Sequence, residues 1–182
     1  MLAVIFSFSK RGGLLNAAIG RFLAGIGCEA KCCTMPKFAG VCGGLTAVDD
    51  YKAVCAEYFN KADALIFIGA SGIAVRAIAP YVKSKTTDPA VLVIDECANF
   101  VISLLSGHIG GANELARQIA AAIKAVPVVT TATDVNNLFA VDEWAARRGM
   151  VIESMQAAKD FAAALVAGKT AGLCSEYAIK GA

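Results

Sequence analysis

Residues 99–114, NFVISLLSGHIGGANE, contain the only histidine of the chain. The apolar run over residues 100–105 predicts a β-strand, and the apolar spacing over residues 112–124 predicts a helix. The glycines between these segments predict a turn. We therefore expect His108 in a strand-to-helix turn at the carboxyl ends of parallel strands, where α/β sheets bind their ligands.

The composition predicts a packed globular protein. The 182 residues can form one sizeable core or two small lobes, and 57% of them are hydrophobic while 18% are charged. A net charge of +2 without a run of Lys or Arg argues against a nucleic-acid partner. No uncharged stretch reaches the roughly 20 apolar residues of a spanning helix, and the first residues lack the basic start of a signal peptide. We expect a cytoplasmic protein without a membrane partner.

The seven cysteines do not predict a disulfide framework, because their number is odd and no secretory signal precedes them. Cys28, Cys32, Cys33 and Cys42 are close in sequence but form no Cys-x-x-Cys pair. We expect them to behave as small apolar side chains rather than as metal ligands.

Apolar strands alternate with helices along the whole chain. The predicted strands are residues 2–7, 29–34, 64–68, 91–94, 100–103, 126–130, 150–152 and 171–178, and the predicted helices are residues 14–24, 48–60, 73–79, 112–124, 139–148 and 156–166. Residues 91–94 and 100–103 are close enough to pair as a hairpin. We expect Thr46 to cap the second helix and Ser71 the third.

This alternation predicts the α/β class, with a doubly wound, mostly parallel sheet, helices on both of its faces and two small lobes as one arrangement. We expect an N-terminal α/β domain over residues 1–134 and a βα segment over residues 135–182.

Four motifs in a fixed order carry a resemblance to a known family. They are GASGIAVRAIAP over residues 69–80, DPAV over residues 88–91, ISLLSGHIGGANELA over residues 102–116 and TTATD over residues 130–134. With these motifs the chain resembles the cobalt-precorrin-5A hydrolases of anaerobic cobalamin biosynthesis, most clearly from about residue 62 to residue 152. That family carries a further C-terminal domain, which we do not expect within these 182 residues. A separate chain that supplies this domain, other pathway enzymes and a second copy of this chain are the partners that the resemblance leads us to expect.

The resemblance implies a hydrolase that opens the δ-lactone on ring A of a cobalt corrinoid. The bridging two-carbon unit would leave as acetaldehyde, giving cobalt-precorrin-5B. No resident cofactor is implied, because the substrate itself carries the cobalt. Such a tetrapyrrole is fringed with carboxylates, which backbone N–H groups at glycine turns and cations such as Arg76, Lys83 and Lys85 can bind.

The candidate catalytic residues are His108, Ser106 and Glu114. His108 is the candidate general acid or base because its unperturbed pKa lies near neutrality. Ser106 is a candidate nucleophile, for which a positioned water is the simpler alternative, and Glu114 or Asp134 could orient the imidazole. The candidate substrate-binding residues are Gly69, Ser71, Gly72, Arg76, Gly107, Gly110, Gly111, Asn113, Thr131, Thr133 and Asp134.

Other functions stay open at this point. A non-catalytic corrinoid-binding or tetrapyrrole-binding module acting with a partner chain would use the same turns and cations. A nucleotide-binding domain is less favoured, because no Gly-x-Gly-x-x-Gly follows the first strand. His108 could cap the turn or bind the substrate's cobalt, Arg76 could be a solvated helix residue, and residues 130–134 could only end a strand and cap a helix.

Overall fold

The computed structural model describes residues 1–172 and residue 174. The chain forms two compact units, Met1–Val129 and Thr130–Ala182, and every residue of the first unit is described. The division that we expected after residue 134 falls inside the second unit.

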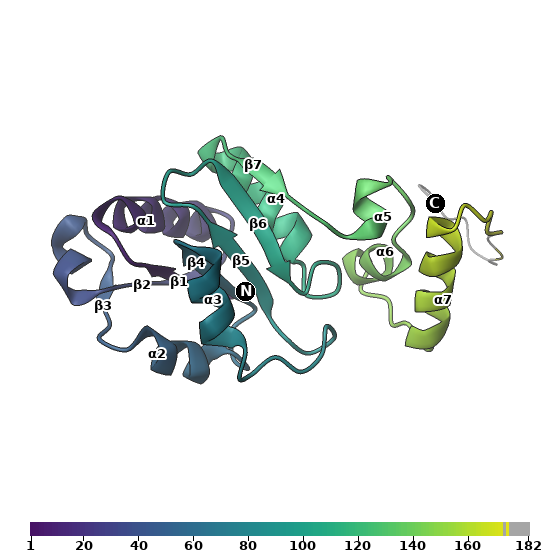
Figure 1. Cartoon of the computed structure of the whole chain (residues 1–182), viewed down its shortest axis with the longest axis horizontal. Coiled ribbons are helices and arrows are strands. Elements are labelled where there is room, and N and C mark those ends of the chain that lie inside the picture. The colour runs from purple at the N-terminus through teal and green to yellow at the C-terminus, as the bar shows by residue number, and fades with distance from the viewer. Residues whose placement is uncertain (173, 175–182) are drawn as a thin grey trace. The chain divides into compact units, whose positions relative to one another are not determined.

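A seven-stranded sheet in the order β3-β2-β1-β4-β5-β6-β7 forms the centre of the first unit (Figure 1). Its strands are β1 (Leu2–Ser7), β2 (Glu29–Thr34), β3 (Thr46–Ala47), β4 (Ala64–Ile68), β5 (Ala90–Ile94), β6 (Phe100–Leu105) and β7 (Val126–Val128). Neighbouring strands are parallel, except that β5 and β6 pair antiparallel as the predicted hairpin. The predicted fold class is confirmed.

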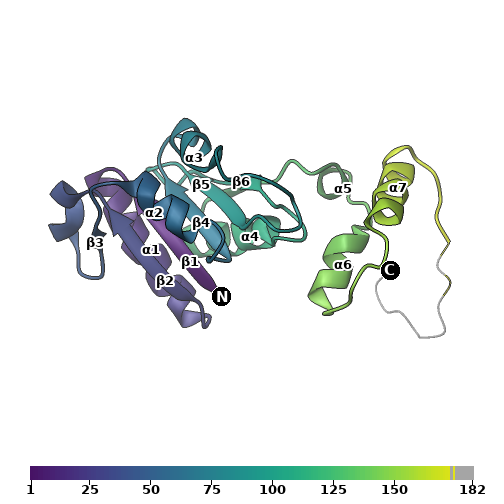
Figure 2. The same ribbon diagram turned by 90° about the horizontal axis from the view of Figure 1, so that it is seen from below.

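Helices cover both faces of this sheet (Figure 2). The core cluster under α1 (Lys10–Gly25) and α4 (Ala112–Ile123) includes Ile19 and Ile119 of these helices. The cluster under α2 (Tyr51–Tyr58) and α3 (Ser71–Ile78) includes Cys55 and Ala74. Because both faces are covered, the central strands β1, β4 and β5 are nearly continuous apolar runs instead of an alternation of apolar and polar residues.

The alternation of side chains along β1 divides its residues between the two clusters. Ile5 belongs to the cluster under α1 and α4, whereas Val4 and Phe6 belong to the other. The ring of Phe6 stacks on Phe67 of β4 with 4.9 Å between the ring centroids. The central strands are therefore fixed by packing on both sides.

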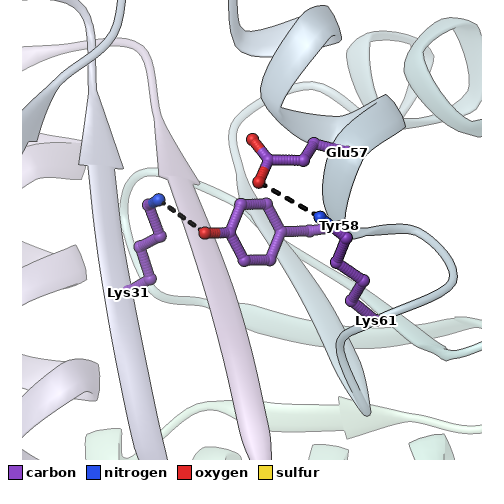
Figure 3. A network of polar contacts seen from close by, with 4 residues as sticks. All are labelled: Lys31, Glu57, Tyr58 and Lys61. Carbon is purple, nitrogen blue, oxygen red and sulfur yellow. Dashed lines mark hydrogen bonds and ion pairs between the residues drawn. The ribbon is translucent and has the colours of Figure 1, made fainter.

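A polar network holds α2 against β2 at the surface (Figure 3). Lys31 Nζ donates to the Tyr58 hydroxyl at 2.8 Å and lies 4.4 Å from the centre of its ring. The hydrogen bond from Lys31 to Tyr58 is the main cause that raises the pKa of Lys31. Lys61 forms an ion pair with Glu57 at 3.3 Å on the same helix end.

Four of the seven cysteines are buried in the first unit: Cys28, Cys32, Cys33 and Cys55. Burial raises the pKa of Cys33 and of Cys55 from 9.0 to about 11. These thiols stay protonated near neutrality and pack as apolar side chains.

Two helices begin elsewhere than the sequence predicted. The first begins at Lys10 rather than at residue 14, because the Ser9 hydroxyl caps it by accepting from the Gly12 N–H at 3.0 Å. The second begins at Tyr51 rather than at residue 48, because Asp50 caps it. The predicted cap of the second helix, Thr46, instead lies in the short edge strand β3.

Smaller corrections concern the ends of other segments. Ser71 is the first residue of α3 rather than its cap, since Ala70 stands in the cap position. The loop expected over residues 36–44 contains a 3₁₀ helix, η1 (Pro36–Val41). In the second unit the helices are α5 (Ala132–Val135), α6 (Val141–Arg147) and α7 (Met155–Val166), and residues 150–152 form no strand. Of the strand expected over residues 171–178, residues 173 and 175–178 lie outside the described residues.

Within the described part of the chain, no helix combines the length and the apolar character that crossing a membrane requires.

Candidate functional site

The histidine loop, residues 106–111, joins β6 to α4. It is closed by backbone hydrogen bonds: the Ala112 N–H donates to the Ser106 carbonyl at 3.1 Å, the Asn113 N–H to the Gly107 carbonyl at 2.9 Å, and the Gly111 N–H to the His108 carbonyl at 2.9 Å. These bonds occupy two N–H groups of the first turn of α4, which would otherwise lack partners inside the helix. The loop is thus a defined structural element and not an open turn.

Two glycines of this loop are required by close packing. A Cβ on Gly107 would stand 2.8 Å from Oδ1 of Asn113. A Cβ on Gly110 would stand 2.4 Å from the Ser106 Cβ and 2.8 Å from the Ser106 carbonyl oxygen. The contact with the Ser106 carbonyl oxygen involves the backbone, which cannot move aside as a flexible side chain would. Gly110 therefore fixes the path of the loop around Ser106.

Ser106 has an unusual backbone conformation and an unusual environment. Its φ of +58° lies in the left-handed region, which residues with a side chain seldom adopt. Its side chain is 6% exposed, and its hydroxyl has no hydrogen-bond partner among the described residues. Of the candidate residues, Ser106 departs most from what stability alone would select.

His108 is half-buried within this loop, two residues beyond Ser106. Glu114, in the first turn of α4, accepts a hydrogen bond from Gln118 Nε2 at 3.0 Å and lies 3.9 Å from the guanidinium of Arg117. The structure thus gathers the candidates of residues 106–114 at one end of the sheet.

That end is not the one that the sequence led us to expect. Because β6 runs antiparallel to β5, Leu105 lies opposite Val91, at the beginning of β5. A Cβ on Gly110 would lie 3.4 Å from the carbonyl oxygen of Asp88, which precedes β5. His108 does follow the carboxyl ends of a parallel pair, β6 and β7. Because the hairpin reverses the chain, however, that end of the sheet is the one where β1, β4 and β5 begin.

A pocket of about 340 Å³ lies at the opposite end, where β1, β4 and β5 finish. Its lining residues are Phe8, Ser9, Ile68, Gly69, Ala70, Ile73, Asp95 and Glu96. From β1 the sheet continues through β2 and β3 on one side and through β4 and β5 on the other. The pocket therefore lies at the switch point, where the order of the strands reverses its direction. Open α/β sheets bind ligands at such points.

The candidates Gly69, Ser71, Gly72 and Arg76 gather around the N-terminus of α3, beside this pocket. A Cβ on Gly72 would stand 3.2 Å from a guanidinium nitrogen of Arg76, so the guanidinium lies over the first turn of its own helix. A cation beside helix N–H groups suits a carboxylate ligand.

Ser9 and Glu96 are pocket residues that sequence reasoning did not select. The Ser9 hydroxyl donates to Glu96 Oε2 at 2.5 Å while it caps α1. The Asp95 carboxylate accepts from the N–H groups of Cys97, Asn99 and Phe100 and holds the hairpin turn. The available signal for Ser9 was its position two residues beyond the end of the first apolar strand.

The remaining candidates lie in the second unit. Thr131 stands in the cap position of α5, and its hydroxyl donates to Asp134 Oδ2. Thr133 is buried. Hydroxyl and carboxylate are thus joined at a helix start, but Thr131 makes no side-chain capping hydrogen bond to α5, so the contact is not the helix cap that the alternative predicted.

Comparison with known proteins gives the chain its relatives. The family described as Cobalamin synthesis G N-terminal matches residues 53–134, a range that includes all four motifs. The chain is 60% identical over 86 residues to the cobalt-precorrin-5A hydrolase of Salmonella typhimurium, covering 47% of this chain and 24% of that protein. It is 51% identical over 108 residues to the cobalt-precorrin-5A hydrolase of Priestia megaterium, covering 59% of this chain and 29% of that protein.

A solved structure supports the fold. It is described as a cobalamin biosynthesis protein G homolog from Sulfolobus solfataricus, with a TM-score of 0.57 and 22% identity, and the match covers 99% of this chain and 51% of that one. The matched part of this chain spans 24% and 29% of the length of the two curated relatives. The resemblance seen in the motifs is confirmed: residues 53–134 of this chain are related to the N-terminal region of the cobalamin synthesis G family.

Proposed function

We propose that the chain acts in the cobalt-precorrin-5A hydrolase reaction. It would open the ring A δ-lactone of a cobalt corrinoid in the cytoplasm, with release of acetaldehyde and without a resident cofactor. The observation that carries this proposal is the identity of 60% and 51% to two proteins that bear this name. Since these relatives are named as hydrolases, they favour a hydrolase over a module that only binds the corrinoid.

We assign the reaction to the histidine loop. Opening a lactone requires a water activated against the carbonyl and hydrogen-bond donors for the oxyanion that develops. His108 is the only side chain of its type in the chain and is half-buried, so it can take a proton from water beside a partly desolvated substrate. Gly111 has open space where a Cβ would stand, among the described residues, so a ligand can approach the loop backbone there.

The pocket end takes a separate role in this proposal. β5 has five residues and spans roughly 17 Å, so the α3 N-terminus and the histidine loop do not line one pocket. Gly69, Ser71, Gly72 and Arg76 would bind a carboxylate at their own end of the sheet.

The test is acetaldehyde release from cobalt-precorrin-5A under anaerobic conditions, with the wild-type chain beside His108→Ala. Loss of a general acid or base lowers turnover by about 10²- to 10⁴-fold. Lys124→Ala, at the far end of α4, is the matched control and should keep wild-type turnover.

Two results would count against this assignment. Unchanged turnover of His108→Ala would remove His108 from the chemistry. A wild-type chain that changes the corrinoid absorbance on binding but releases no acetaldehyde would favour the binding module.

A further inference from the structure

Ser106 combines two unfavourable features in one residue. Its φ is +58°, where a Cβ crowds the backbone, and its buried hydroxyl has no hydrogen-bond partner among the described residues. Both features would disappear if the residue were glycine. The hydroxyl therefore does not stabilise the loop in this conformation.

The structural roles open to a serine at this position are already filled. The cap position of α4 belongs to Gly111, so Ser106 does not cap that helix. The Ser106 carbonyl, not its hydroxyl, closes the loop by accepting from the Ala112 N–H at 3.1 Å. The packing against Gly110 involves the Ser106 Cβ and carbonyl oxygen, which alanine would also provide.

A role as nucleophile does not fit this geometry either. A nucleophilic serine needs a base within hydrogen-bond reach of its hydroxyl. The Ser106 hydroxyl makes no hydrogen bond with any described residue and is shielded from solvent. It can act only on a molecule that reaches it when the loop changes conformation.

We propose that Ser106 is a substrate-binding residue whose hydroxyl donates a hydrogen bond to an oxygen acceptor of the corrinoid, a carboxylate or the lactone carbonyl, when the histidine loop opens. Gly111, where a Cβ would meet no described atom within 4 Å, gives the end of the loop the backbone freedom to open. Opening would end both the left-handed conformation and the burial of the lone hydroxyl, so substrate binding favours the open loop. This inference rests on the proposed function, because the substrate supplies the acceptor.

The experiment compares Ser106→Ala, Ser106→Gly and a matched control, Lys124→Gly. Lys124 also has a left-handed backbone, with φ of +59°, but ends α4 away from the loop. Thermal melting reports stability, and titration of cobalt-precorrin-5A followed by absorbance reports binding.

We expect Ser106→Ala to leave the melting temperature unchanged or to raise it, and Ser106→Gly to raise it further because glycine adopts the left-handed conformation freely. Both variants should weaken corrinoid binding by about tenfold, the loss of one hydrogen bond to a charged or polarised acceptor. Lys124→Gly should raise the melting temperature and leave binding unchanged.

Several results would overturn the inference. A lower melting temperature of Ser106→Ala with unchanged binding would show that the hydroxyl stabilises the fold. Lost turnover with unchanged binding would make Ser106 a nucleophile. Failure of the wild-type chain to bind the corrinoid would overturn the proposed function together with this inference, whereas equal binding by wild type and both Ser106 variants would overturn the inference alone.

Discussion

The two ends of the sheet in the first unit are built by different means. The histidine end is a glycine-rich loop whose atoms are packed so closely that Gly110 has no room for a Cβ. The pocket end is held by polar groups: Ser9 caps α1 and reaches Glu96, and Asp95 holds the hairpin turn. The difference teaches that motifs close in sequence can be separated by one chain reversal, here the hairpin of β5 and β6.

The largest effect should come from added volume at the histidine end. Gly110→Ala places a Cβ 2.4 Å from the Ser106 Cβ, so the loop must shift. We expect a loss of about 2–3 kcal/mol in the free energy of unfolding, as for overpacked sites, together with loss of acetaldehyde release. Urea denaturation and the acetaldehyde assay measure the two effects.

Gly111→Ala is the control for this substitution. Gly111 has φ of +79° but no neighbouring atom within 4 Å of the position of a Cβ, among the described residues. It should lose only about 1 kcal/mol, from backbone strain. Equal losses for the two variants would mean that close packing does not define this end.

The core that both ends share should weaken in alkali. The folded state holds the protons of Cys33 and Cys55 up to about pH 11, whereas an unfolded thiol releases its proton above its usual pKa of 9.0. The contribution of the two thiols to the free energy of unfolding is therefore fully present below pH 9 and is lost as the pH rises from 9 toward 11. The loss is about 1 kcal/mol per thiol between pH 9 and pH 10. Urea denaturation at pH 8, 9 and 10 measures this slope.

Cys55→Ala should make that slope shallower, although it lowers stability at every pH because it opens a cavity. The raised pKa of Lys31 adds to the wild-type slope in the same direction and is unaffected by this substitution. A slope that Cys55→Ala leaves unchanged would show that the thiols do not set the alkaline limit.

The pocket end should respond to a lost hydrogen bond rather than to volume. Ser9→Ala removes the cap of α1 and the donor to Glu96, and we expect it to cost about 1 kcal/mol of stability in thermal or urea unfolding. Glu96→Ala removes only the second contact and should cost less. If Glu96→Ala cost as much as Ser9→Ala, the cap would not be the stabilising contact.

We expect the smallest effect on stability in the surface network between α2 and β2, which belongs to neither of the two ends. Tyr58→Phe removes the acceptor of Lys31 but keeps the ring, and we expect a loss of about 0.5 kcal/mol, as for exposed polar contacts. The pKa of Lys31 should fall, which NMR titration of its Nζ group would detect. An unchanged Lys31 pKa would contradict the assigned cause.

The sequence predicted the central strands well because strands buried on both faces, such as β4, are continuous apolar runs, but it missed the short edge strand β3 and predicted a strand over residues 150–152 that does not form. It placed the start of α1 too late, since Gly12 and Gly13 suggest a turn, whereas both lie inside the helix that Ser9 caps. The hairpin was predicted, but not its consequence for His108.

The conformation of Ser106 could not be predicted, because it depends on Gly110 packing against it across the loop. Local residue preferences do not report such contacts, so the candidate residues were found but their division between two ends was not.

The hairpin turn carries a cysteine that can be labelled selectively. The four core thiols are buried, while Cys97 is exposed on the turn that Asp95 holds, next to the pocket residue Glu96. A maleimide dye should therefore react at Cys97 and at the exposed Cys174, and replacing Cys174 with serine would leave Cys97 as the fast-reacting site. Fluorescence from that dye would report events at the pocket end while the histidine end stays unlabelled.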